Sequence, residues 1–364
     1  MRNTLTKTGS PRSASSGGQA QAKNRSTGLS GFCFFLCTLA ALLVSGCRGS
    51  VEPLQTSTSP PEAVSVNSLM PEAVRIIRDG LADNDPRVRA NAIEVVAATR
   101  PTPLMPKVQR LLQDEFVPVR FLAILTVGDL QYALAREQVK QLLGDPDENV
   151  RIAGAYALMK LGHTEYLKVF RNAIASDDQT VRANAALLLG KSGDTSSLTQ
   201  QVLWWALQRN DSNDKVRFQA AEALAMLGDE RIYPKLWAML ISAYADDRVV
   251  GIRAMGALGT EQAKNALVTM LDDGVLEVRL AAAEQLGKLK DPIGEPEVLE
   301  VFTKNLTAGL DKPGLERVNV LTALAIGQIG TNKLVKYLPL LLKDESVFVR
   351  IAATKAVFQC AMRR

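Results

Sequence analysis

The chain has 364 residues, of which 47% are hydrophobic and 22% are charged. This composition excludes a chain that is disordered throughout, and the length is sufficient for a sizeable buried core. Only 5% of the residues are aromatic, while alanine, leucine and valine recur along the whole chain. That balance favours close-packed helices over strands, so an all-α fold is expected.

The formal charge of +5 comes from the start of the chain. Residues 1–46 contain no acidic residue and five basic ones: Arg2, Lys7, Arg12, Lys23 and Arg25. Without these five, 38 basic residues remain against 38 acidic ones, so the chain from Cys47 onward is formally neutral. The charge therefore gives no general basis for binding DNA or RNA, and no nucleic-acid partner is predicted.

Residues 1–46 have the parts of a secretory signal: a basic stretch, then an apolar run that is short for a transmembrane span. The run ends in "LVSGC", which resembles the lipobox of bacterial lipoproteins. The resemblance implies that Cys47 is lipidated after cleavage just before it, and that it anchors the chain to a membrane on the non-cytoplasmic side. Arg48, in place of an aspartate, favours sorting to an outer membrane. The alternative is an uncleaved membrane anchor with an incidental cysteine.

Cysteine use agrees with this interpretation. Cys33 and Cys37 lie in the apolar run and would leave with it, so the mature chain would keep lipidated Cys47 and Cys360, with no internal disulfide. Residues 47–68 are rich in Ser, Thr and Pro and predict a flexible tether.

Beyond the tether the chain repeats itself. A Val-Arg pair followed by small and apolar residues recurs at intervals of 31, 31, 31, 35, 31 and 31 residues, and after 40 and 31 more at Asn319 and Arg350. The arginines are Arg89, Arg120, Arg151, Arg182, Arg217, Arg248, Arg279 and Arg350. Six residues before eight of these nine positions stands Asp or Ser, residues that favour turns and helix caps.

Thirty-one residues suffice for one helical hairpin, which must stack on its neighbours to bury its apolar faces. The Val-Arg pair, the central Ala and the Leu-x-x-Leu-Gly ending resemble HEAT-like repeats, particularly the short repeats of bilin lyases. The sequence therefore predicts a right-handed α-solenoid of about nine two-helix HEAT-like repeats over residues 69–364. The resemblance further implies that the arginines form a structural ladder with turn aspartates and carbonyls of adjacent units; an anion-binding groove is the alternative.

The residue after each arginine position is apolar in all nine units: Ala90, Phe121, Ile152, Ala183, Phe218, Val249, Leu280, Val320 and Ile351. At 100° per residue this column lies nearly opposite the stripe containing Val150, Ala157, Leu158 and Leu161. Helix B lines the concave side in HEAT-like folds, so the larger residues of the column are candidates for an apolar binding groove. The other interpretation is that stacking buries the column between neighbouring helices.

The sequence contains few of the histidines and cysteines that catalysis and zinc binding commonly use. The single histidine, His163, follows the helix-ending Gly162, and one histidine with one unmodified cysteine cannot form a zinc site or a catalytic triad. The metal oxygenases that the repeats resemble need several His-Glu pairs, which are absent here. No catalytic residue, metal or cofactor is predicted. Trp204 and Trp205 are expected to be core and rim residues, with an aromatic platform as the alternative.

These observations predict a non-enzymatic, membrane-anchored scaffold that binds a protein partner through its concave helix-B face. The alternatives are a groove enzyme or a carrier of an apolar ligand, similar to the bilin lyases. The last unit carries Phe348, Val349 and Phe358 and no polar capping helix, which suggests self-association through the C-terminal repeat.

Overall fold

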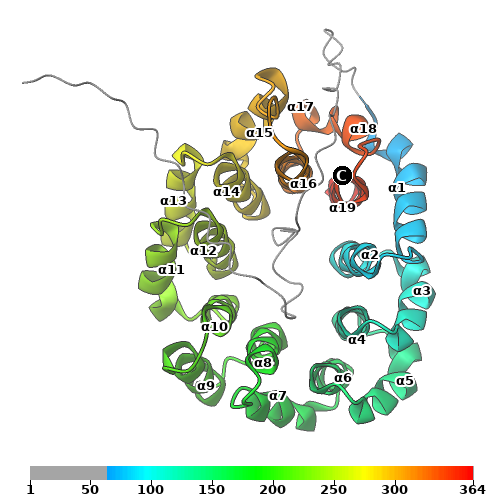
Figure 1. The fold of residues 1–364 in the computed structure, drawn as a ribbon, viewed down its shortest axis with the longest axis vertical. Helices are drawn as coiled ribbons and strands as arrows, with labels where there is room; N and C mark the ends of the chain where they lie inside the picture. The colour runs from blue at the N-terminus through cyan, green and yellow to red at the C-terminus, as the bar shows by residue number, and fades with distance from the viewer. Residues whose placement is uncertain (1–63, 364) are drawn as a thin grey trace, which may run out of the picture.

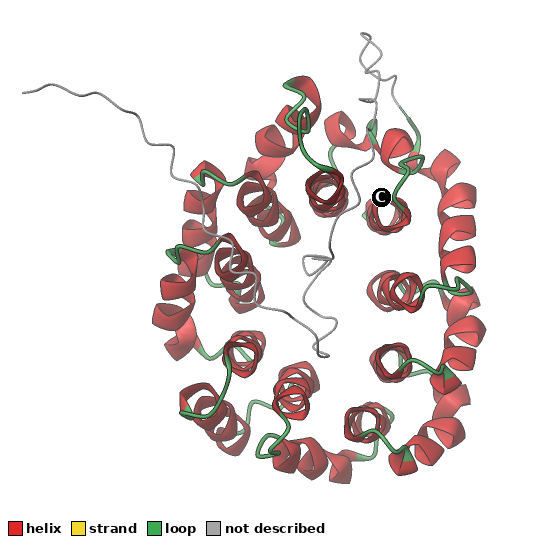
Figure 2. Cartoon of the chain, in the orientation of Figure 1, coloured by secondary structure: helices red, strands yellow, loops and turns green. Residues whose placement is uncertain are grey.

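The computed structural model describes residues 64–363, and these form two concentric layers of helices. The chain alternates between an outer helix and an inner helix nine times, and the described residues contain no strand (Figures 1 and 2). The all-α solenoid predicted from the 31-residue period is confirmed. The first helix begins at Val66, three residues before the predicted start of the repeats, while the predicted signal segment and most of the tether lie outside the described residues.

The outer helices are α1 (Val66–Gly80), α3 (Met105–Arg110), α5 (Arg136–Gln141), α7 (Leu167–Ala173), α9 (Ser197–Gln208), α11 (Tyr233–Leu240), α13 (Glu261–Thr269), α15 (Glu295–Thr303), α17 (Asn332–Val335) and α18 (Leu338–Leu341). The inner helices are α2 (Pro86–Thr99), α4 (Val117–Asp129), α6 (Glu148–Lys160), α8 (Gln179–Ser192), α10 (Asp214–Met226), α12 (Ala245–Leu258), α14 (Leu276–Lys288), α16 (Lys312–Ile329) and α19 (Val347–Met362).

Short 3-10 segments precede or follow many of the outer helices. They are η1 (Thr102–Leu104), η2 (Leu111–Gln113), η3 (Ala133–Ala135), η4 (Leu142–Gly144), η5 (Thr164–Tyr166), η6 (Glu230–Ile232), η7 (Met270–Asp272) and η8 (Pro292–Gly294).

Side-chain caps and left-handed residues set the ends of the inner helices. The carboxylates of Asp147 and Asp178 each accept two backbone N–H groups of the first turn, which would otherwise lack partners. At the other end, glycines such as Gly193 (φ 75°) and Gly330 (φ 72°) adopt the left-handed conformation that reverses the chain. Each unit therefore folds as a hairpin with defined ends.

The solenoid closes into a ring. Helix α19, the last inner helix, packs against both α1 and α2 of the first unit as well as against α16 (Figure 1). The guanidinium carbon of Arg87 lies 5.8 Å from the ring centre of Phe348, across this joint. Phe348, Val349 and Phe358, which suggested an exposed C-terminal surface, are all buried. The reason for predicting self-association is thus removed, because the chain covers its own last repeat.

Neighbouring inner helices approach each other at small residues. A Cβ atom built on Gly128 would lie 2.8 Å from the Cα atom of Ala157, and one built on Gly190 would lie 2.8 Å from the Cα atom of Ala223. Such distances are shorter than real contacts, so a larger residue at either glycine would push the helices apart. The small residues eight positions after the arginines therefore allow close contact between inner helices.

The joint of the ring can be tested at Gly80, where α1 meets α2 and α19. A Cβ atom there would lie 3.2 Å from the Cβ atom of Ala92 and 3.7 Å from the Cδ1 atom of Ile351. We expect Gly80→Leu to reduce the free energy of unfolding by about 1–3 kcal/mol, because it overpacks this joint. Gly144→Leu, at a site with no neighbouring atom within 4 Å, is the control. Urea denaturation measures both; equal stability of the two variants would contradict closure at Gly80.

Candidate functional site

The predicted arginine positions lie at the start of the inner helices and link consecutive units. Arg89 donates two hydrogen bonds to the carboxylate of Asp114 in the next unit, at 2.7 and 2.8 Å. Arg120 donates in the same way to Asp145, at 3.1 Å for both bonds. Each of these arginines also donates to the carbonyl oxygen six residues before it, at 2.8 Å, which is that of Asp83 for Arg89. These bonds fix one turn to the next.

Departures from this pattern follow from the sequence of the next turn. Arg151 faces a unit whose turn residue is Ser176, and it donates only to carbonyl oxygens of its own turn. Arg279 donates instead to Glu297, at 2.9 Å. The remaining positions make these contacts: Arg182 with Asp211, Arg217 with Asp214 and the carbonyl of Asn210, Arg248 with Asp273, Asn319 with Asp344, and Arg350 with the carbonyls of Asp344 and Glu345. These ion pairs and carbonyl contacts favour the structural ladder over an anion-binding row.

The predicted apolar groove is wrong. Of its column, Ala90, Phe121, Ile152, Ala183, Val249, Leu280, Val320 and Ile351 are buried, and Phe218 is half-buried. The column is turned toward the neighbouring inner helix rather than toward the axis of the ring, so it forms helix-to-helix packing. Because the ring is closed, each inner helix has such a neighbour on both sides, and no concave groove is left at this column.

A different column faces the axis. The third residue after each arginine points outward, as shown by Gly251, whose Cβ atom would lie 2.8 Å from Met239 of outer helix α11. The fifth residue lies about 160° around the helix from the third and therefore points inward. These inward residues are Glu94, Leu125, Tyr156, Leu187, Glu222, Arg253, Glu284, Leu324 and Lys355. Charged residues occupy five of the nine positions, a periodic signal that the sequence analysis missed.

The inward charges form contacts within the ring. Lys191 on α8 lies 2.8 Å from the carboxylate of Asp129 on α4, reaching past α6. The same carboxylate accepts a hydrogen bond of 2.5 Å from the hydroxyl of Tyr156 on α6. On the other side, Arg253 lies 3.7 Å from the carboxylate of Glu222. Three consecutive inner helices are thus tied together through polar side chains at the centre of the molecule.

Burial shifts the pKa values of these groups. Burial raises the pKa of Glu94 to about 7, against the opposing effect of Lys355 and Lys191. Burial likewise raises the pKa of Glu222 to about 7, opposed by a hydrogen bond from Gln219 and by the charges of Lys288 and Lys191. The pKa of Arg253 falls to about 10 through burial, opposed by Glu284. Burial is therefore the main cause of the shift in each of these three pKa values.

Residues 64–363 contain no group of three or more His, Cys, Asp or Glu side chains that could hold a metal ion. His163 is partly exposed on a connecting segment beside Glu165, at 3.5 Å. Cys360, the cysteine of the described residues, is buried in α19. Neither residue lies beside an acid–base pair that could activate it.

An aromatic surface lies on the outer layer of the fifth and sixth units. All three tryptophans of the chain are there: Trp204 and Trp205 on α9, and Trp237 on α11. Trp205 is 44% exposed and Trp237 is 39% exposed. Leu198 and Ile241, at the ends of the same two helices, are more exposed still. We call Leu198, Trp204, Trp205, Trp237 and Ile241 the tryptophan surface.

Polar contacts hold these rings in place. The indole N–H of Trp204 donates to the carboxylate of Asp229 at 2.9 Å, so this ring bridges two units. The guanidinium of Arg231 lies over Trp204 at 5.8 Å, and that of Arg209 lies over Trp205 at 4.8 Å. Half-buried Trp204 and exposed Trp205 agree with the expectation of a core and a rim residue, and the exposure of Trp205 leaves the alternative of an aromatic platform open.

A family model for HEAT repeats matches residues 104–186, 167–250 and 242–314, which together span more than half of the chain. The chain belongs to the HEAT-repeat family. Integrator complex subunit 4 of Xenopus laevis is 27% identical to this HEAT-repeat chain over 254 residues, which are 67% of the chain and 24% of that protein. The chain thus spans about a quarter of the length of this relative.

Two solved structures match the chain at low similarity. The complex of CpcE and CpcF of phycocyanin lyase from Nostoc sp. PCC7120 is 17% identical, with a TM-score of 0.39, over 69% of this chain and 93% of the matched chain. Human deoxyhypusine hydroxylase is 17% identical, with a TM-score of 0.36, over 74% of this chain and 98% of the matched chain.

The raised pKa values predict how the stability of the HEAT-repeat ring depends on pH. A carboxyl whose pKa is higher in the folded state stabilises the fold at low pH, and this contribution is lost as pH rises through the folded pKa near 7. We expect the free energy of unfolding to fall by about 2–4 kcal/mol between pH 5 and pH 8. Urea denaturation at a series of pH values measures this fall.

Glu222→Gln should remove about half of the fall, because the amide cannot ionise. Exposed Glu230→Gln, in a connecting segment of the same unit, is the matched control and should leave the fall unchanged. A pH profile that is the same in Glu222→Gln as in the wild type would contradict the assignment.

Proposed function

We propose that the HEAT-repeat ring is a non-enzymatic scaffold that binds a protein partner and is held at a membrane through lipidated Cys47. The observation that carries the scaffold function is the tryptophan surface. Trp204 is fixed by a hydrogen bond, and a guanidinium group covers exposed Trp205. Tryptophan is typical of binding hot spots, where large rigid side chains gain contact area at little entropic cost. The partner therefore binds the outer layer, not the concave face.

A protein suits the tryptophan surface better than an anionic lipid bilayer does. The cations beside the rings are already paired, Arg231 with Asp229 at 2.6 Å and Arg209 with Asp211. Attraction to anionic lipids requires a net positive surface, which paired charges do not provide. A partner with an apolar centre and a polar rim would match both the rings and the paired charges around them.

The interior supports binding rather than catalysis or transport. Asp129 and Lys191 pair with each other, so this acid and this base are not free to act in catalysis. A carrier of an apolar ligand would need an apolar cavity at the column of Phe121 and Leu280, and both of these side chains are buried in packing. A bilin-lyase-like groove activity is disfavoured for the same reason.

The scaffold proposal predicts that partner capture depends on the tryptophan surface. A photo-reactive residue at exposed Gln201, one turn before Trp205, should cross-link a defined protein in native membranes. Trp205→Ser with Trp237→Ser should reduce that cross-link by about tenfold or more, since hot-spot losses exceed about 1–2 kcal/mol. Exposed Leu134→Ser, in the second unit, is the control. Undiminished cross-linking in the double variant, with unchanged helical melting, would overturn the proposal.

The anchor has its own test, independent of the partner. Cys47→Ser in the full chain should abolish incorporation of radiolabelled palmitate and leave the precursor uncut, because the thiol is the acylated group in the proposed lipobox. Membrane fractionation should then place wild-type protein with the outer membrane. Equal palmitate labelling of wild type and Cys47→Ser would contradict the lipid anchor. Among residues 64–363, no helix combines the length and apolarity needed to cross a bilayer.

A further inference from the structure

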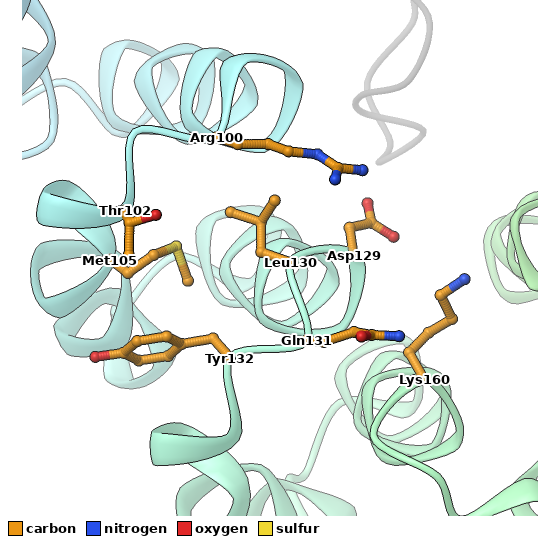
Figure 3. A pocket seen from close by; sticks show the side chains of 8 residues that line it. All are labelled: Arg100, Thr102, Met105, Asp129, Leu130, Gln131, Tyr132 and Lys160. Carbon is orange, nitrogen blue, oxygen red and sulfur yellow. The ribbon is translucent and has the colours of Figure 1, made fainter.

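A pocket opens at the rim of the ring where the first three units meet. Its volume is about 410 Å³, and its walls come from the segments that follow α2 and α4, from α3, and from the end of α6 (Figure 3). Half-buried Leu130 and Tyr132 form one side, and the lining there is completed by Met105, whose side chain is buried (Figure 3). The other side is polar. A pocket with apolar walls and a few polar groups is the common form of a ligand site.

The polar side carries two cations with no partner among the described residues. The guanidinium of Arg100 and the ammonium of Lys160 both extend beside the pocket, and neither forms an ion pair or a hydrogen bond within residues 64–363. Asp129 also lines the pocket, but its carboxylate is bonded to Lys191 and to the hydroxyl of Tyr156. The carbonyl ends of nearby helices add only partial negative charge. The site is therefore positive overall.

Backbone geometry marks the same residues. Arg100 and Gln131 have φ angles of 55° and 51°, the left-handed conformation that is costly for any residue other than glycine. Glycine fills the corresponding positions in five other units: Gly162, Gly193, Gly228, Gly259 and Gly330. The chain thus keeps two long polar side chains in an unfavourable conformation, and both line the pocket. Lys290, with φ 65°, is the third such position and lies in the seventh unit, outside the pocket.

We propose that this rim pocket binds a carboxylate attached to an apolar body of about one or two amino-acid residues. The planar guanidinium of Arg100 suits a carboxylate, which it can bind through two parallel hydrogen bonds, while Lys160 supplies a second charge. The amide of Gln131 and the hydroxyl of Thr102 add donors, and half-buried Leu130 and Tyr132 receive the apolar body. A cation is disfavoured, because Asp129 already has two partners. The acid can be the end of a protein chain or a free small molecule.

The probe is N-acetyl-Ala-Phe with a free carboxylate, compared with the same dipeptide as its amide, titrated calorimetrically into the full chain in detergent. The carboxylate should bind at least about tenfold more tightly than the amide, the size expected for a charge-assisted pair. Arg100→Gly should remove this preference for the carboxylate. The variant should also raise the melting temperature, because glycine adopts the left-handed conformation of position 100 without strain, as it does at the corresponding position of five other units. Lys290→Gly, the matched control, should also raise the melting temperature and leave binding unchanged.

Equal binding of the carboxylate and the amide, or undiminished carboxylate binding by Arg100→Gly, would overturn the proposal. Lys160→Met provides a second variant at the other cation, and it too should weaken binding of the carboxylate alone. An octapeptide ending in Ala-Phe distinguishes the two sources of the acid: tighter binding than the dipeptide indicates a chain end, and equal binding indicates a small free acid. Either result for the octapeptide agrees with the proposed chemistry.

Discussion

Outer helices along the described ring pack against two inner helices, their own and the one before it. Helix α7 lies on α6 and α8, α13 lies on α12 and α14, and α15 lies on α14 and α16. For the first described outer helix, α1, the place of the preceding inner helix is taken by α19. The ring therefore closes with the same kind of joint that links its inner units. An open solenoid would leave two apolar ends to be capped, whereas here the first and last units cap each other.

Closure also determines the environment of the charges. At the turns between outer and inner helices, arginines such as Arg89 pair with aspartates in short, two-bond contacts near the surface. Toward the axis, burial raises the pKa values of half-buried Glu94 and of buried Glu222. An isolated hairpin could not keep such groups from solvent. Burying these ionisable groups reduces the stability of the folded ring, and the packing at the joints between units offsets that loss.

The period of 31 residues predicted the hairpins, the number of units and the turn aspartates, because these depend on local spacing and capping. The partner of Arg89 could be inferred as well, since Asp114 stands 25 residues later, and so could the exception at Arg151, where the next turn has Ser176. Closure could not be predicted, because small differences in angle between units accumulate over the whole chain and no single residue encodes their sum.

The error about the apolar column has the same origin. Phe121 and Leu280 lie opposite the outer helix on a helical wheel, but the wheel does not say where the neighbouring inner helices stand. With a neighbour on each side, the axis is faced by the residues four positions later, where Leu125 and Glu284 lie. The rim pocket could not be predicted from the sequence either, because its walls come from three units and depend on the φ angles of Arg100 and Gln131.

A closed ring has consequences for binding that an open solenoid does not have. An open superhelix can flex along its length and adjust its concave face to a ligand, but a ring whose last helix packs on its first has a fixed curvature, because bending one joint must strain the others. The tryptophan surface on α9 and α11 and the rim pocket at the first three units are therefore held at constant separation and orientation. Surfaces presented in this way suit partners that must be kept in a defined arrangement.

Helix α1, where the described chain begins, lies at the joint where the ring closes. If the proposed lipid anchor holds the chain at a membrane, tension on the segment before α1 would act directly on the contact between α1 and α19. The joint that stabilises the ring would then also bear the load of membrane attachment.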